Sequence, residues 1–130
     1  MRWRRRSSLI LLLTLACDDS TAPGGRILQG HWGSIDAELV AIYAGAELRF
    51  ECVFAIIDHA VPVSSDSTFT ARARLARRRR ANLEILATIQ LTGSIANGDV
   101  TISVPASSDN SAATYVLQPG VTRTPVVCPT

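Results

Sequence analysis

Hydrophobic and polar residues alternate one by one over several stretches of this chain, which is the period of a half-buried β-strand. In residues 47–54 the alternate residues Leu48, Phe50, Cys52 and Phe54 share one face. In residues 68–75 they are Phe69, Ala71, Ala73 and Leu75, and in residues 83–92 they are Leu83, Ile85, Ala87, Ile89 and Leu91. The pattern predicts three strands that turn these residues, Cys52 included, towards a core.

Turn signals separate these strands from shorter ones. Asn97-Gly98 favours a type I′ hairpin, because both residues accept positive φ angles, and residues 100–104 are its return strand. Residues 44–46, 64–67 and 119–120 are further predicted turns, and the arginine tract 77–80 is predicted to be a loop tip. Weaker strands are predicted at 36–43, with Leu39, Ala41 and Tyr43 inward, at 113–118 and at 121–128. Residues 56–63 are ambiguous, since Pro62 restricts any strand there to an edge.

Helical periodicity is convincing nowhere after residue 17. Short, regularly spaced strands with hairpin-length turns predict an all-β fold, a single small antiparallel meander closed into a barrel or folded into a sandwich. A lipocalin-like barrel is included, because the medium-sized inner residues fit either a packed or a hollow core. Trp32, between Gly30 and Gly33, is predicted to plug one end of the barrel, with ligand stacking as the alternative.

The first residues are predicted to be an export signal. Residues 2–6 contain four arginines and no acid, and Leu9–Ala16 is apolar except for Thr14. This apolar run suits a signal peptide and is shorter than the roughly 20 residues needed to span a bilayer.

The five residues Leu13-Thr14-Leu15-Ala16-Cys17 resemble the lipobox of bacterial lipoproteins. The resemblance implies that Cys17 is lipidated and becomes the first residue of the mature chain, which is then anchored to a bacterial membrane in the cell envelope. The predicted parts are a signal peptide (1–16), the lipidated cysteine with a flexible tether (17–29) and a β-domain (30–130). An ordinary cleaved signal is the alternative. Residues 18–25 have no apolar pattern and reach at most about 26 Å.

With Cys17 acylated, Cys52 and Cys128 are the cysteines that remain. Two thiols of one small exported domain are expected to form a disulfide in an oxidising compartment. The alternative is one buried thiol and one frayed thiol at the C-terminus. Neither these cysteines nor His31 and His59 have the spacing of a metal site, so no metal and no cofactor is predicted.

The order of motifs also resembles a family of small bacterial β-domain lipoproteins without an assigned activity. The matching features are Trp32-Gly33, Cys52, the stretch from Leu91 to Ile102, and Cys128. The resemblance implies a fold and carries no chemistry.

All 13 basic residues are arginines, against 11 acids. The signal contains four of the arginines, so the mature chain has nine against 11, a formal charge of −2, and nucleic-acid binding is not expected. Six arginines are predicted to gather on one face: Arg72, Arg74, Arg77, Arg78, Arg79 and Arg80. They suit contact with anionic lipid head groups or an anionic envelope polymer. The alternative is a solvated loop that protects a sheet edge.

The sequence contains no hydrolase, phosphate-binding or metalloprotease motif. Asp58-His59 with Ser64 and Ser65 is the one cluster that resembles a hydrolytic group, and a polar surface loop explains it better. We therefore predict a non-enzymatic, membrane-anchored binding module of the cell envelope with a protein or polymer partner. The alternative is a lipocalin-like carrier of a small apolar ligand.

Overall fold

The computed structural model describes residues 26–128. The regular secondary structure of this region consists of β-strands, with no helix. The ten strands of this region are β1 (Arg26–Ile27), β2 (Gly30–Gly33), β3 (Ala37–Ile42), β4 (Gly45–Phe50), β5 (Val53–Ile57), β6 (Pro62–Val63), β7 (Thr68–Arg79), β8 (Asn82–Ala96), β9 (Asp99–Val104) and β10 (Ala113–Pro119). Within these residues there is no helix long and apolar enough to cross a membrane.

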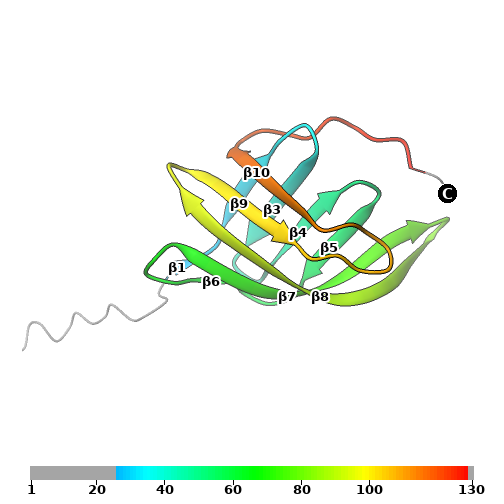
Figure 1. Ribbon diagram of the computed structural model, residues 1–130, viewed down its shortest axis with the longest axis horizontal. Coiled ribbons are helices and arrows are strands. Elements are labelled where there is room, and N and C mark those ends of the chain that lie inside the picture. Colours follow the sequence, from blue (N-terminus) through cyan, green and yellow to red (C-terminus); the bar gives the residue numbers. More distant parts are fainter. Residues whose placement is uncertain (1–25, 129–130) are drawn as a thin grey trace, which may run out of the picture.

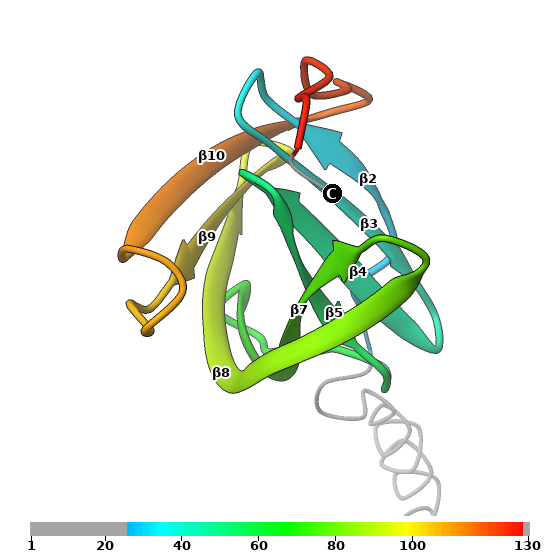
Figure 2. The same cartoon turned by 90° about the vertical axis from the view of Figure 1, so that its right-hand side faces the viewer.

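Eight of these strands close into an antiparallel barrel (Figures 1 and 2), in the order β10-β2-β3-β4-β5-β7-β8-β9, with β9 paired to β10. The order follows the chain, so the barrel is an up-and-down meander that leaves few strand edges exposed. β1 and β6 form a separate two-stranded ribbon beside it. The predicted all-β meander is confirmed, and it closes as a barrel.

The barrel interior is filled with side chains. The largest side chains that are completely buried come from strands all around the ring and from the segment before β6: Phe50, Leu39, Leu48, Leu75, Leu91, Ile102, Leu117, Val61, Val100 and Val104. They form one hydrophobic cluster with smaller alanines and valines. Alternate residues of each strand supply this core, as the sequence pattern predicts for β7 and β9.

The strand predicted at 47–54 is a hairpin instead. β4 ends at Phe50, Glu51 and Cys52 form the turn with Glu51 at φ 52°, and β5 begins at Val53. After this turn Val53, Ala55 and Ile57 face the core. The prediction that Cys52 and Phe54 point inward is therefore wrong: Cys52 lies in the turn. The turn contains neither Gly nor Asn, and the apolar alternation continues through it, so the sequence pattern hides it.

A one-residue bulge corrects the prediction for residues 83–92. Leu75 pairs with Ala87, but the next residue, Ala76, pairs with Ile85, so Leu86 is the extra residue of β8. An extra residue exchanges the two faces of a strand. Ile89 and Leu91 are buried as predicted, whereas Leu83 and Ile85, on the other side of the bulge, are 46% and 47% exposed.

Both ends of the described chain also differ from expectation. β1 pairs with β6, and Leu28 is buried with its N–H bonded to Val61 O at 2.9 Å. Residues 26–29, predicted as the last part of the tether, thus belong to the fold. Residues 121–128, predicted as a strand, contain none.

Tyr43, predicted inward, lies in the β3–β4 turn and is exposed, because β3 ends at Ile42.

Trp32 closes one end of the barrel, as predicted. It is only 9% exposed, and its indole N–H donates to Gly98 O at 3.1 Å, which joins β2 to the β8–β9 turn. Its ring covers Gly30, where a Cβ would lie 2.7 Å from the ring atom Cη2. The β8–β9 turn is the predicted Asn97-Gly98 hairpin, with φ angles of 54° and 86°.

Candidate functional site

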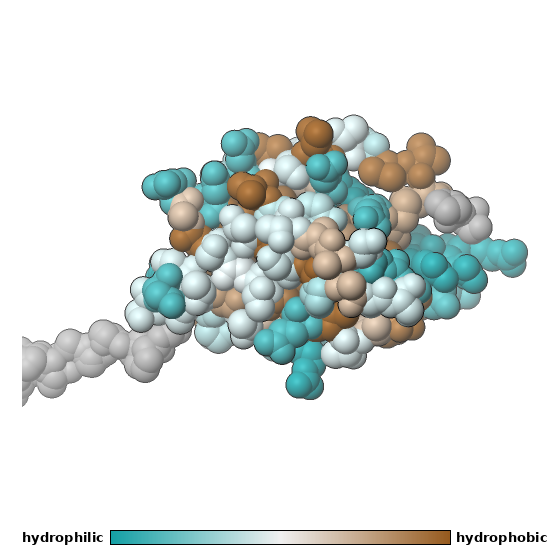
Figure 3. Space-filling view, in the orientation of Figure 1, coloured by the Kyte–Doolittle hydropathy of each residue, from teal (hydrophilic) through white to brown (hydrophobic). Residues whose placement is uncertain are grey.

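The β7–β8 hairpin projects beyond the barrel. β7 and β8 stay paired from Thr68↔Ser94 to Arg79↔Asn82, but β5 pairs with β7 only between Arg74 and Ala76. Residues 77–84, which we name the basic arm, therefore extend past the end of β5 (Figure 1). Figure 3 shows hydrophilic side chains gathered at this end of the molecule.

The arginine tract lies mostly in a strand and not in a loop tip. Arg77, Arg78 and Arg79 end β7, and Arg80 begins the turn with φ 58°. Neighbouring residues of a strand point to opposite faces, so the tract is divided between two faces. The prediction that six arginines gather on one face is therefore wrong. Arg72 and Arg74 lie on the outer face of the barrel, where Arg74 Nη2 is 3.4 Å from Asp58 Oδ2.

On one face of the arm, Glu84 pairs with two arginines. Its Oε1 atom lies 3.1 Å from Nε of Arg77 and 3.7 Å from Nε of Arg79. Both pairs are substantially exposed, and pairs of this kind stabilise a protein by no more than about 1 kcal/mol. The arm still carries four arginines against one glutamate, so it is a projecting positive group. This surface suits a negatively charged partner.

On the other face, an aromatic ring joins the arm to the barrel. The Cζ atoms of Arg49 and Arg78 lie 5.9 Å and 6.0 Å from the ring centroid of Phe54. This distance suits cation–π attraction. Arg49 also donates from Nε to Glu47 at 2.7 Å, and this hydrogen bond raises the pKa of Arg49. The contact joins Arg78 of the arm to β5 of the barrel.

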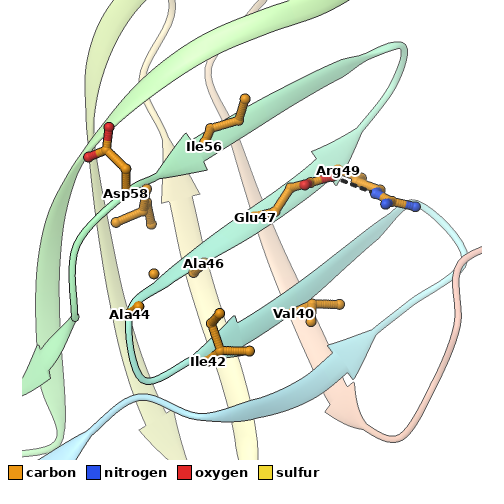
Figure 4. A pocket seen from close by; sticks show the side chains of 10 residues that line it. Val40, Ile42, Ala44, Ala46, Glu47, Arg49, Ile56 and Asp58 are labelled. Carbon is orange, nitrogen blue, oxygen red and sulfur yellow. Dashed lines mark hydrogen bonds and ion pairs between the residues drawn. The ribbon is translucent and has the colours of Figure 1, made fainter.

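An apolar hollow of about 420 Å³ lies on the outside of β3, β4 and β5 (Figure 4). Val40 and Ile42 line it from β3, and Ile56 lines it from β5. It shares Glu47, Arg49 and Ile56 with the smaller hollow beside Phe54 and Arg78. Sequence reasoning missed this surface, although one signal was visible: Val40 and Ile42 make both faces of β3 apolar.

The Cys52–Cys128 disulfide is present, with Cα atoms 5.6 Å apart, and this prediction is confirmed. It ties the β4–β5 turn to the C-terminal segment 121–128, which passes in front of the barrel end in Figure 2. Arg123 supports the same connection, because its Nη1 donates to Glu51 O at 3.1 Å. Burial raises the pKa of nearby Tyr115, and the charges of Glu51 and Asp36 raise it further.

The residues of the imagined hydrolytic cluster bond elsewhere. His59 Nδ1 contacts Ala60 O, Asp58 pairs with Arg74, and Ser64 bonds to Asp66 and Thr68. Among residues 26–128 no three histidine, cysteine or acidic side chains are grouped to hold a metal ion. Cys17, the predicted lipidation site, lies outside the described residues.

Fold and surface together define the described part as a filled eight-stranded up-and-down barrel with a projecting basic hairpin. Comparisons with protein-family models, with curated proteins and with solved structures found no match.

Proposed function

We propose that this protein is an exported, lipid-anchored, non-enzymatic interaction module that binds an anionic partner through its basic arm. The observation that carries the proposal is the arm itself, four arginines on a hairpin that extends past the end of β5. An exposed positive group speeds association with anionic partners and selects among them.

The membrane anchor rests on Cys17 and the export signal before it. Two acyl chains on the cysteine give stable anchoring where a single chain is marginal. β1, the first described strand, and the tip of the arm lie at opposite ends of the molecule in Figure 1. β7, with its 12 residues, alone spans about 40 Å between these ends. With the membrane anchor at the β1 end, the arm would point away from that membrane, which favours an anionic envelope polymer or protein over its lipid head groups.

A lipocalin-like carrier receives less support. Such a carrier requires an interior space that side chains do not fill. Here the inner positions of β4, β7, β8 and β9 are occupied by completely buried side chains, and the apolar hollow of Figure 4 opens on the outside of the barrel. Detection of a co-purifying apolar ligand by native mass spectrometry would support the carrier function instead.

Replacing Arg77, Arg78, Arg79 and Arg80 by Ser is expected to weaken partner binding at least tenfold, because four positive charges leave the arm. Tenfold corresponds to about 1.4 kcal/mol, a modest sum for four contacts. The measurement is quantitative pull-down from an envelope extract, with the partner's charge determined afterwards. The matched control replaces the same residues by Lys, which keeps the charge and is expected to retain most of the binding. If the Ser variant and the wild type recovered equal amounts of the partner, the arm would not be the binding surface.

The intact mass of protein extracted from membranes tests the anchor. We expect a chain that begins at Cys17, carries acyl chains, and lacks two hydrogens because Cys52 and Cys128 are bonded. A chain that begins at Met1, or a mature chain without acyl groups, would contradict lipid anchoring. The interaction through the arm is measured separately and does not depend on this result.

A further inference from the structure

The last residue of β3 and the first residue of the β3–β4 turn expose two large apolar side chains. Ile42 and Tyr43 are 61% and 65% exposed, and Val40 beside them is also exposed on the outer face of β3. The apolar hollow of Figure 4 begins at the same turn, where Ile42 and Ala44 line it. A cluster of exposed apolar side chains of this kind marks an interaction surface.

This turn lies at the end of the barrel where the described chain begins. Ala41 pairs with Gly30, and β3 runs antiparallel to β2, so Ile42 and Tyr43 continue past Gly30 towards β1. Figure 1 shows β1 at the end of the molecule away from the tip of the arm. The exposed turn and the start of the fold therefore share one end, and the basic arm occupies the other.

The length of chain before β1 limits how far this end lies from the anchor. Eight residues lie between Cys17 and Arg26, and the nine Cα–Cα steps from one to the other span at most about 30 Å when fully extended. A flexible chain of this length has a mean end-to-end distance of about 17 Å. Lipidation of Cys17 would thus hold the β3–β4 turn within reach of the bilayer surface.

We propose that Ile42 and Tyr43 insert into the interface of the anchoring bilayer and hold the barrel upright, with the basic arm pointing away. The inference rests on the lipid anchor of the proposed function. Tyrosine suits this place because its ring is apolar and its hydroxyl stays in contact with water, and membrane interfaces are enriched in it. The charged side chains that line the same hollow are Glu47, Arg49 and Asp58, two acids against one base, so the contact is expected to need no anionic lipid.

The test uses the mature protein as its own host exports and processes it, mixed with phosphatidylcholine vesicles whose acyl chains carry bromine, a quencher of tryptophan fluorescence. Trp32 is the only tryptophan of the mature chain, and its burial gives a low background of quenching. We expect Tyr43→Trp to lose at least half of its added emission relative to unbrominated vesicles. The matched control is Leu83→Trp, a half-exposed position on the arm, which is expected to lose none.

Three other outcomes overturn the inference. If the protein sediments with the vesicles but Tyr43→Trp is not quenched, the anchor stands and the turn does not insert. If both tryptophans are quenched equally, the barrel lies flat on the bilayer. If the protein does not sediment with vesicles, the anchor fails, and the inference fails with it. Tyr43→Ser checks the contact without a new tryptophan. Insertion should slow amide hydrogen exchange at the turn when vesicles are added, and Tyr43→Ser should abolish this slowing.

Discussion

Replacing Cys52 and Cys128 together by Ser is expected to lower the free energy of unfolding by up to about 4.5 kcal/mol, the value of the chain-entropy model for a loop of this size. The bond joins residues separated by 76 positions, which is most of the described chain. Without it the unfolded chain gains freedom, and in the folded chain the Arg123–Glu51 hydrogen bond still joins the C-terminal segment to the β4–β5 turn. Small domains are stable by about 5–15 kcal/mol in total, so the loss is a large fraction.

Urea unfolding of the oxidised wild type and of the double variant measures this loss. The wild type treated with a reducing agent is the control, and its midpoint should move to that of the double variant. The double substitution is preferred to a single one, because a lone cysteine remains reactive. Stability within about 0.5 kcal/mol of the wild type, the usual scatter of surface substitutions, would show that the bond constrains little.

Replacing Trp32 by Ala is expected to destabilise the barrel by about 3–5 kcal/mol, the usual result for a buried tryptophan. The ring fills one end of the core and covers Gly30. The substitution also leaves Gly98 O without its indole donor and separates β2 from the β8–β9 turn. Denaturant unfolding followed by circular dichroism is the measurement, because the variant lacks the fluorophore.

Trp32→Phe separates the two contributions. It keeps an aromatic ring in the core but removes the N–H that bonds to Gly98 O, and it should cost clearly less, about 1–2 kcal/mol. Val116→Ala, at an exposed position of β10, serves as the neutral control. If Trp32→Phe were as damaging as Trp32→Ala, the indole hydrogen bond rather than the filling of the barrel end would be the main contribution.

The fold class was predictable because the alternation of apolar residues is a local property. β7 and β9 have their expected inner faces, and Asn97-Gly98 has its expected turn. The errors arise where a structural change leaves that alternation looking intact. The Glu51-Cys52 turn preserves it because Phe54, an outer residue, is as apolar as the core residues before it. The bulge at Leu86 is hidden in the same way, since Leu83 and Ile85 remain apolar after the faces exchange.

The candidate site was predictable in composition and not in geometry. The sequence shows the run of arginines, but the faces on which they lie depend on Arg77 to Arg79 continuing β7 instead of forming a loop. Their partners are also non-local. Phe54 under Arg78 comes from β5, and the pairing of β2 with β3 is what brings the exposed β3–β4 turn to the end where the described chain begins. Such neighbours follow from barrel closure, which no pattern within one strand encodes.

Beyond Ala76, the two strands of the arm pair only with each other, so their length is independent of the closure of the barrel. Adding two residues to each strand of the arm would preserve which side chains share a face and would move the tip outward by about 6.6 Å. Evolution or design can therefore tune the height at which the positive charge is displayed without re-engineering the body that carries it. The length of the hairpin can thus vary while the barrel stays the same.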